Sequence, residues 1–477
     1  MAELHDLTAL EQWDELHRGR LSPRELVDHY LERIARLDPA IGALTVVEPE
    51  RARARAAGLE RGEVARTAPL WGIPIADKEL SARAGQVTSY GSRLRAGFVP
   101  EHSDELVEQL DAAGAISLGA TAAPEFGLPS YTESAQSGAT RNPYDLARGA
   151  GGSSGGAAAA VAAGLLPVAP GSDGGGSVRI PAAACGLVGL KPSRGRVPAG
   201  SGLDRLAGLV VPGPLARTVS DAALMLDAMV EGAPWEFATR APSPHDGPLL
   251  GYAVRGEGRF QLGVVTDSPW DDWCEVGLAP EAQAALDGAL RLFAQMGHGI
   301  EQLEPRPEPE YAEHFRTVWM AGAAGIPART PDELAQLEPL TAWLVERGRA
   351  LPASRLAEAL AGLAAFERRV VRRFAAVDVV VTPALAMTPR PIGWYDAVDA
   401  ERNFRQQVQY TPFTSFVNVS GLPALTVPVG LTGPDSAEPG LPMGVQLIGR
   451  PGGEAALLSL GAQLERRRGP LPHPAMW

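Results

Sequence analysis

Two glycine-serine clusters, GGSSGG and GGGS, flank an alanine-rich run within residues 149–180, and they constrain the fold more than any other feature. Glycine loses more backbone entropy on folding than any other residue, so such clusters are either flexible linkers or loops with a backbone geometry closed to other residues. Their neighbours are apolar: residues 157–163 predict a buried helix and residues 166–169 a strand. Linkers join domain edges, so we expect both clusters to be ordered loops inside one domain.

The composition permits a large core. The chain has 477 residues, of which 45% are hydrophobic and 21% charged, which is too hydrophobic for a disordered protein. A net charge of -13 with no basic block disfavours nucleic acid as a partner. The apolar run at residues 157–168 is shorter than the roughly 20 residues of a membrane span, so we expect no membrane insertion.

The first residues of the chain and its two cysteines bear on the cellular location and on metal binding. The first residues, MAELHDLTALEQWDEL, lack the basic and apolar regions of a signal peptide, which predicts a cytoplasmic protein. Cys185 and Cys274 show no metal-ligand spacing, so we expect no metal site built on them.

Helix and strand patterns alternate along the chain. Ser22, Pro23 and Glu25 form a helix start, with an N-cap serine, a proline at the first position and a capping glutamate. Further helices are predicted at residues 48–61, 103–113, 157–163 and 454–466, and strands at 71–76, 116–119, 166–169, 377–382, 424–429 and 443–448. Buried strands that alternate with helices predict one large α/β domain, with a mixed, mostly parallel sheet covered by helices on both faces.

Known glycine motifs offer several interpretations of the clusters. A P-loop would need a lysine after its glycines, and the match to a dinucleotide fingerprint is imperfect. Residues 151–155 fit the GxSxG nucleophile elbow, but residues 144–150 before them are polar and turn-like, not a strand. No histidine lies between His102 and His245, although a distant histidine leaves a Ser-His-Asp site open as an alternative.

The lysines suggest a different base. Only Lys78 and Lys191 occur, so 43 - 2 = 41 of the basic residues are arginine. An amine can give up its proton at usable pH, whereas a guanidinium group cannot. Lys78 follows a predicted apolar strand in WGIPIADKEL. A fourth interpretation, beside the Ser-His-Asp site, is serine catalysis with lysine as the base.

Several motifs together resemble the amidase signature family of serine hydrolases. They are GIPIADKEL, RNPYDLARGAGGSSGG, GSDGGGSVRIPAAACGLVGLKPSRGRV, FVNVSGLPALTVPVG and GLPMGVQLIGR. The resemblance covers most of the chain and weakens between about residues 233 and 374. It implies one amidase domain over residues 1–477, with an N-terminal helical segment (1–66), a catalytic core (67–230), a variable, mainly helical substrate-access region (231–375) and a C-terminal part of the sheet (376–477).

The resemblance implies a Ser-cisSer-Lys triad. The family's lysine falls on Lys78, its bridging serine on Ser153 and its nucleophile on Ser177, with a cis peptide bond between Gly152 and Ser153. Burial at the end of an apolar strand disfavours the ammonium form, so Lys78 is expected to be neutral and to receive the Ser177 proton through Ser153. No metal or organic cofactor is required.

The resemblance also assigns the residues around the nucleophile. The oxyanion hole is expected from the backbone N–H groups of Gly174, Gly175, Gly176 and Ser177. Gly174 stands where family members often carry a larger residue. Asp173 and Arg179 fall on supporting residues, and Ser154 and Lys191 are expected to be structural.

The substrate is less constrained by the sequence. We expect an apolar entrance lined by Phe315, Trp319, Met320, Tyr410, Phe413 and Phe416, although each of these side chains could instead belong to the core. We find no obvious basic anchor for an anionic acyl group. The expected substrate is a small hydrophobic or aryl amide, or a carbamate or anilide, which also makes the protein a urethanase candidate. It would be cleaved by a monomer or homodimer.

Two alternative functions remain. Within the family, the chain could be the amidase subunit of a glutamine-dependent transamidosome. A catalytically idle binding or scaffold protein of the same fold would lack one of Lys78, Ser153 or Ser177, and all three are present.

Overall fold

The sequence-predicted helix starts are visible in the computed structural model, which describes residues 3–197, 206–230, 241–242 and 247–477. Helix α2 (Pro23–Ile41) begins with the predicted capping box: the Glu25 N–H donates to Ser22 Oγ at 3.2 Å, and the Ser22 N–H donates to the Glu25 carboxylate at 2.8 Å. Its Leu26 and Tyr30 side chains are buried.

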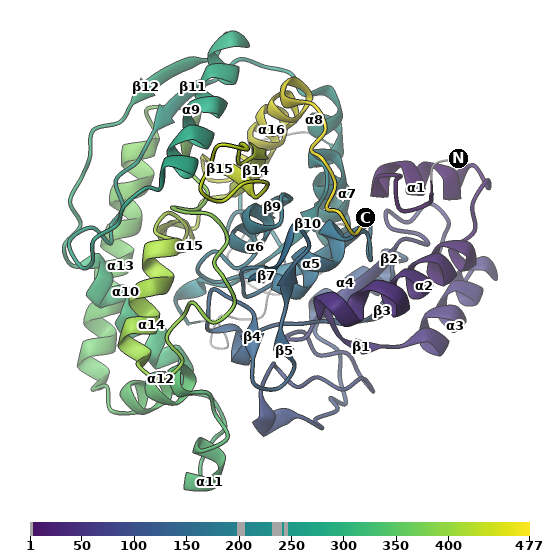
Figure 1. Cartoon of the computed structure of the whole chain (residues 1–477), viewed down its shortest axis with the longest axis horizontal. Helices are drawn as coiled ribbons and strands as arrows, with labels where there is room; N and C mark the ends of the chain where they lie inside the picture. The colour runs from purple at the N-terminus through teal and green to yellow at the C-terminus, as the bar shows by residue number, and fades with distance from the viewer. Residues whose placement is uncertain (1–2, 198–205, 231–240, 243–246) are drawn as a thin grey trace.

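Helices surround the strands on several sides (Figure 1). In chain order, the helices besides α2 are α1 (Ala9–His17), α3 (Pro49–Glu60), α4 (Glu105–Ala112), α5 (Gly155–Ala162), α6 (Arg179–Ala184), α7 (Val219–Val230), α8 (Leu249–Arg255), α9 (Pro280–Gln295), α10 (Tyr311–Ala323), α11 (Pro331–Leu334), α12 (Pro339–Arg349), α13 (Ala353–Phe374), α14 (Ala400–Tyr410), α15 (Ser415–Ser420) and α16 (Glu454–Arg468). Short 3-10 helices lie at Arg93–Arg95, Glu125–Gly127 and Leu206–Gly208. Figure 1 shows α1 to α3 on one side of the molecule and α10, α12 and α13 on the other.

An eight-stranded mixed sheet forms the centre of the fold. In spatial order its strands are β12 (Gly299–Gln302), β11 (Gln261–Val264), β13 (Val379–Pro383), β15 (Pro442–Gly449), β14 (Ala424–Leu431), β9 (Val188–Lys191), β10 (Val211–Ala216) and β8 (Val168–Asp173). The pairs β12 with β11 and β11 with β13 are parallel, and every other neighbouring pair in this sheet is antiparallel. The predicted mixed α/β sheet is confirmed.

The prediction of a mostly parallel sheet is wrong. Strands β8 and β9 are joined through α6 and run in the same direction, as alternation predicts, but β10 lies between them and runs the opposite way. Strands β14 and β15 follow each other as an antiparallel pair. Alternation along a chain indicates the direction of helix-linked strands, and it does not reveal which later strand is inserted between them.

Both faces of the sheet are buried. Along β13, Val379 and Val381 join one apolar core, and Val380 joins another on the opposite face. Because successive side chains of a strand point to opposite faces, this alternation shows core on both sides. The predicted cover on both faces is confirmed.

A smaller sheet delivers one of the candidate residues. It has the order β1 (Leu44–Val47), β3 (Ile116–Thr121) and β2 (Pro74–Lys78), with β2 parallel to β3. Strand β2 packs beside β8 of the large sheet. This packing places Lys78, the last residue of β2, next to the carboxyl end of β8.

The segment before the first glycine cluster differs from its prediction as a polar turn. It forms a small hairpin of β6 (Arg141–Asn142) and β7 (Asp145–Gly149). A similar hairpin precedes it, made of β4 (Glu133–Ser134) and β5 (Gly138–Ala139). Strand β7 pairs with the short strand β6 and does not join the large sheet. Its side chains are partly or fully exposed, so it lacks the apolar pattern of a buried strand.

The variable region contributes more than helices. It also supplies the edge strand β12 and its neighbour β11, which were not predicted because both are short and contain glycine and glutamine. The predicted boundary at residue 231 lies outside the described residues. Within the described ranges, no helix is both long and apolar enough to cross a membrane.

We predict that Gly156→Ala lowers stability sharply. An added Cβ would lie 2.3 Å from the backbone nitrogen of Ala122 and 2.5 Å from the Ala43 carbonyl oxygen, so α5 would have to move away from its neighbours. The expected cost is about 3 kcal/mol in the free energy of unfolding, measured by urea denaturation.

The matched control is Gly288→Ala within α9, where the nearest atom would lie 3.5 Å from the new Cβ. Here alanine replaces glycine inside a helix without a clash, so stability is expected to rise by about 1 kcal/mol. Similar effects of the two substitutions would contradict the close packing of α5.

Candidate active site

Lys78 is buried at the end of β2, with 2% of its surface exposed. Its Nζ lies 2.9 Å from Ser153 Oγ, 3.1 Å from Ser172 Oγ and 3.3 Å from the Ser172 carbonyl oxygen. Burial lowers the pKa of Lys78 to about 7, although the negative charge of Asp173 acts in the opposite direction. A substantial fraction of this amine is therefore neutral near pH 7.

Ser153 stands in the loop before α5. The peptide bond between Gly152 and Ser153 is cis, as the family resemblance implies. A Cβ on Gly152 would lie 2.6 Å from the Tyr131 carbonyl carbon, so the chain passes too close for any other residue. The next residue, Ser154, donates its backbone N–H to the Ser177 carbonyl oxygen at 3.1 Å, which joins the two glycine-serine loops.

Ser177 lies between β8 and α6. Its side chain lines the same cavity as Ser153 and Ser172. In the described part of the chain, no hydrogen bond links the hydroxyls of Ser153 and Ser177. The structure therefore brings the three predicted triad residues to one place, with the Lys78 to Ser153 contact already formed.

The backbone donors around Ser177 differ in availability. The Gly176 N–H donates to Asp173 Oδ1 at 2.8 Å, so its predicted place in an oxyanion hole is not supported. Among the described residues, no protein acceptor takes the N–H groups of Gly174, Gly175 or Ser177. Glycine is required at 176 for another reason: its φ is +131°, and a Cβ would lie 2.4 Å from Thr414 Oγ1.

Asp173 and Arg179 form a buried ion pair at the two ends of this loop. The guanidinium donates to the carboxylate from Nε at 2.9 Å and from Nη2 at 2.8 Å. Burial alone would raise the pKa of Asp173, but the adjacent Arg179 charge holds it well below its usual range. The carboxylate stays ionised and also accepts the backbone N–H of Val178 at 3.2 Å.

Sequence reasoning missed the residues that complete this network. Asn418 Nδ2 donates to the Asp173 carbonyl oxygen at 2.7 Å, and Arg179 donates to Asn418 Oδ1 at 2.6 Å and to Gln446 Oε1 at 2.5 Å. Thr414 Oγ1 donates to the Gly175 carbonyl oxygen at 2.6 Å. A usable signal existed, since Asn418 and Gln446 are amides inside the apolar motifs FVNVSGLP and GVQLIG.

The second lysine has a different setting. Lys191 is fully buried in β9 and donates to the Pro192 carbonyl oxygen at 2.8 Å. Burial and the nearby charge of Arg179 lower the pKa of Lys191 to about 7. It lines neither of the cavities at Ser177, in keeping with the structural role expected for it.

Two cavities meet at Ser177, and we name the smaller one the inner cavity and the larger one the outer cavity. The inner cavity, of about 60 Å³, is lined by Leu128, Pro129, Ser130, Gly175, Ser177, Ile180, Trp270, Phe315, Trp319, Phe404, Gln407, Val408, Thr411 and Ser415. The outer cavity, of about 340 Å³, is lined by Leu80, Ser81, Tyr90, Asp104, Phe126, Gly127, Leu128, Ser153, Ser172, Gly174, Ser177, Leu206, Leu209, Val210, Val318, Trp319, Gly322 and Ala323. The substrate-sized space at the candidate nucleophile is thus divided into two compartments.

Of the predicted entrance residues, Phe315 lines the inner cavity and Trp319 lines both cavities, whereas Tyr410 is buried in a core cluster. Met320 follows Trp319 on α10 and, about 100° around the helix, is buried in an apolar cluster against which Trp319 packs. Phe413 and Phe416 are buried in the core between the sheet and the helices α10 and α13. Aromatic composition near the site did not distinguish lining residues from core residues.

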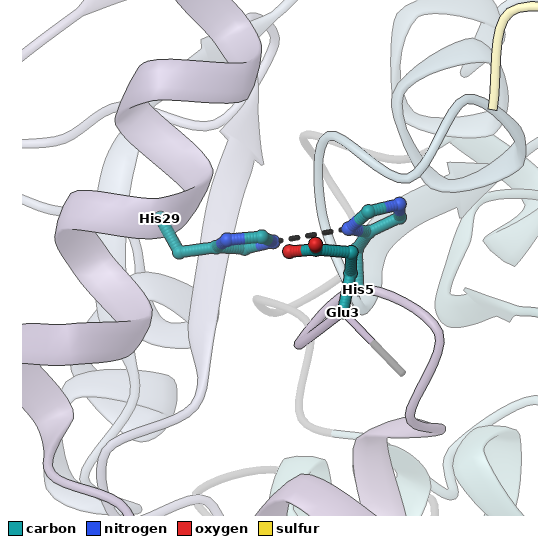
Figure 2. A group of neighbouring side chains, drawn as sticks. All are labelled: Glu3, His5 and His29. Atoms are coloured by element: carbon teal, nitrogen blue, oxygen red, sulfur yellow. Dashed lines mark hydrogen bonds between the residues drawn. The ribbon is translucent and has the colours of Figure 1, made fainter. Parts of the chain in front are cut away.

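One group of side chains has metal-ligand chemistry, at the N-terminal segment (Figure 2). Ligand atoms of Glu3, His5 and His29 lie within 4.8 Å of one another. However, His5 Nδ1 and His29 Nε2 already form a hydrogen bond of 3.2 Å, and burial and Arg33 lower the pKa of His5 to about 4. These surroundings disfavour added positive charge, so we assign the group to the packing of the segment on α2.

We predict that Arg179→Met destabilises the protein by about 3–5 kcal/mol, because it leaves the Asp173 carboxylate buried without its counter-charge. The matched control is Arg373→Met, which removes an arginine that donates to Asp267 at 2.9 Å and 3.0 Å away from Ser177. The Arg373–Asp267 pair is more exposed, so a clearly smaller loss is expected. Equal losses in urea denaturation would contradict the special position of the Arg179 pair.

Comparison with known proteins agrees with this geometry. The amidase family model matches residues 25–458. The chain is 41% identical over 455 residues to a putative amidase, AmiB2, of Mycobacterium tuberculosis, covering 94% of each chain. It is 35% identical over 507 residues to one of the subunits of the glutamyl-tRNA(Gln) amidotransferase of Nitratidesulfovibrio vulgaris, covering 100% of this chain and 99% of the relative.

Solved structures show the same fold. A 6-aminohexanoate cyclic dimer hydrolase in complex with its substrate superimposes with a TM-score of 0.87 and 31% identity, over 99% of this chain and 100% of the other. A bacterial aryl acylamidase of the amidase signature enzymes superimposes with a TM-score of 0.82 and 25% identity, over 97% and 96% of the two chains. This chain therefore belongs to the amidase signature family, hydrolases that act on amide bonds.

Proposed function

We propose that this chain is a serine amidohydrolase in which Ser177 is the nucleophile, Ser153 the proton relay and Lys78 the base. The observation that carries the proposal is the 2.9 Å contact between Lys78 Nζ and Ser153 Oγ, made by a buried amine whose pKa is lowered to about 7. A base with a pKa near the working pH is well suited to proton transfer, and the contact gives that base a path to the cavity that holds Ser177.

The first half of the reaction forms an acyl-enzyme. As Ser177 Oγ bonds to the carbonyl carbon of the substrate, its proton passes to Ser153 Oγ and the Ser153 proton passes to neutral Lys78. The backbone N–H groups of Gly174, Gly175 and Ser177 are the candidates to stabilise the developing oxyanion. The relay then returns a proton to the amide nitrogen, the C–N bond breaks and the amine leaves. Water repeats the sequence and releases the acid.

The proposed substrate is an uncharged amide, anilide or carbamate. Among the residues that the structure describes, no charged side chain lines the inner cavity, and its wall is rich in aromatic rings. A charged group would lose its hydration there without a counter-charge. The structural relative named an aryl acylamidase supports the same class.

A second candidate is the amidase subunit of a glutamine-dependent amidotransferase. The match to an amidotransferase subunit over the whole of this chain favours it. That function would need partner subunits, so the purified chain by itself would hydrolyse simple amides poorly. On expression in its own host, the chain would co-purify with those partner subunits. The expected cytoplasmic location and the monomeric or homodimeric state stay predictions.

We predict that kcat/KM rises with pH through a single ionisation near the lowered Lys78 pKa. The ammonium form cannot accept a proton, so activity is low below about pH 7 and reaches a plateau above it, as expected from the pKa of about 7. Lys78→Arg should lose about 10²–10⁴-fold in activity, because guanidinium stays protonated.

The controls for this profile are single histidine variants, which should retain both the activity and the pH dependence. A Lys78→Arg enzyme with near wild-type turnover, or one folded histidine variant without activity, would favour a histidine triad instead.

We predict that Ser177→Ala abolishes labelling by a fluorophosphonate probe, because the attacking oxygen is absent. Ser153→Ala should still be labelled, but more slowly and with little amide turnover, because it keeps the nucleophile and loses the relay. Mass spectrometry of the labelled chain measures both. Full labelling of Ser177→Ala, or full turnover by Ser153→Ala, would show that the roles are assigned incorrectly.

A further inference from the structure

The two cavities at Ser177 have three lining residues in common. Trp319, Leu128 and Ser177 line both cavities, whereas their other lining residues belong to one cavity or the other. Two side chains, one from α10 and one from the segment before the first hairpin, therefore stand between the compartments. A substrate bonded to Ser177 has to place one part on each side of them.

The relay serine shows which part lies on which side. Ser153 lines the outer cavity and not the inner one. Under the proposed mechanism, Ser153 protonates the leaving nitrogen, and a proton donor has to lie within hydrogen-bond reach of the atom that receives its proton. The amine part of the substrate consequently lies in the outer cavity. The acyl part has the inner cavity as its remaining space.

The inner cavity is small and uncharged. Its volume of about 60 Å³ is well below the roughly 150 Å³ of an apolar cavity that accepts benzene in another protein. Two of its polar side chains have partners: Gln407 Oε1 accepts the Ser130 N–H at 2.8 Å, and Ser415 Oγ accepts the Trp270 Nε1–H at 3.0 Å. The buried Ser130 Oγ has no hydrogen-bond partner among the described residues. Because the space is small and carries no charge, it suits a short, uncharged acyl group.

The wall is held in place by α10. The Trp319 ring stacks on Phe315 one turn away, with ring centroids 5.5 Å apart and an angle of 16° between the planes. A Cβ added to Gly174 would lie 3.5 Å from the Trp319 ring and 3.0 Å from Val210 Cγ2. Even a Cβ at position 174 would thus contact the Trp319 ring, so the glycine lets the ring lie close to the loop that carries Ser177.

We propose that Trp319 and Leu128 divide the site into an acyl compartment and an amine compartment, so that the preferred substrates pair a short, uncharged acyl group with a bulky amine. This inference rests on the proposed function and adds the orientation and size of the substrate. Trp319 is then a specificity-determining residue: it limits the acyl group by closing the inner cavity against the outer one.

An isomeric pair of amides tests the orientation. N-(naphthylmethyl)acetamide carries its large group on the amine, and N-methyl-naphthylacetamide carries the same group on the acyl side. Both release a primary alkylamine, so their intrinsic reactivities are similar. The wild-type enzyme is expected to cleave the first isomer with a kcat/KM at least about tenfold higher, a typical size for a pocket that excludes a group. Equal rates or the opposite preference would overturn the inference.

Variants on α10 test the wall. Trp319→Ala should raise kcat/KM for the acyl-bulky isomer and reduce the preference to about threefold or less, because the cavities merge. Gly322→Leu fills the mouth of the outer cavity, where no atom lies within 4 Å of an added Cβ, and should slow mainly the amine-bulky isomer. Met320 lines neither cavity, so Met320→Leu is the matched control. This variant is expected to keep the wild-type preference between the two isomers. An unchanged preference in Trp319→Ala would overturn the inference.

Fluorophosphonate labelling separates the two possible failures. If Ser177 of the wild-type chain is labelled but the isomers show no preference, or neither is cleaved, the division of the site is wrong while the nucleophile stands. If Ser177 is not labelled in a folded chain, the proposed function fails, and the inference fails with it.

Discussion

The buried Asp173–Arg179 pair is the interaction on which the site depends. It closes the loop from β8 to α6, and the carboxylate also accepts backbone N–H groups at Gly176 and Val178. Charges buried this deeply are stable only when every hydrogen-bonding position is used, which Asn418 and Gln446 accomplish from α15 and β15. The position of Ser177, the proposed nucleophile, is thereby tied to the strands at the centre of the sheet.

The two buried lysines have similarly lowered pKa values but different surroundings. Burial lowers the pKa of both Lys78 and Lys191 to about 7, so the pKa alone does not identify the base. Lys191 donates to a neighbouring carbonyl oxygen in β9, whereas Lys78 contacts the hydroxyls of Ser153 and Ser172, which line a cavity. Position relative to a substrate-sized space, and not proton affinity, distinguishes a catalytic amine from a structural one.

Local patterns predicted much of the fold because their causes are local. The capping box at Ser22 formed as expected, since its atoms lie within one helical turn, and the alanine-rich run after the first glycine cluster became α5. The predictions that failed depend on distant neighbours. The sheet is mainly antiparallel because β10 enters between β8 and β9 and because β14 and β15 run antiparallel to each other and to their neighbours β9 and β13. Met320, Phe413 and Phe416 pack in cores instead of lining the site.

By itself, the sequence determined the family, the glycine-serine loops and the identities of Lys78, Ser153 and Ser177 as candidates, because short motifs with rare residue types carry that information. Only the tertiary structure decided that the Gly176 N–H is taken by Asp173, that amides of α15 and β15 support the loop, and that Trp319 stands between two cavities. The contacts of Asn418 and the two cavities join segments more than 100 residues apart, and no local pattern of residues encodes them. The bond from the Gly176 N–H to Asp173 is local, but it depends on the loop conformation that these distant contacts hold in place.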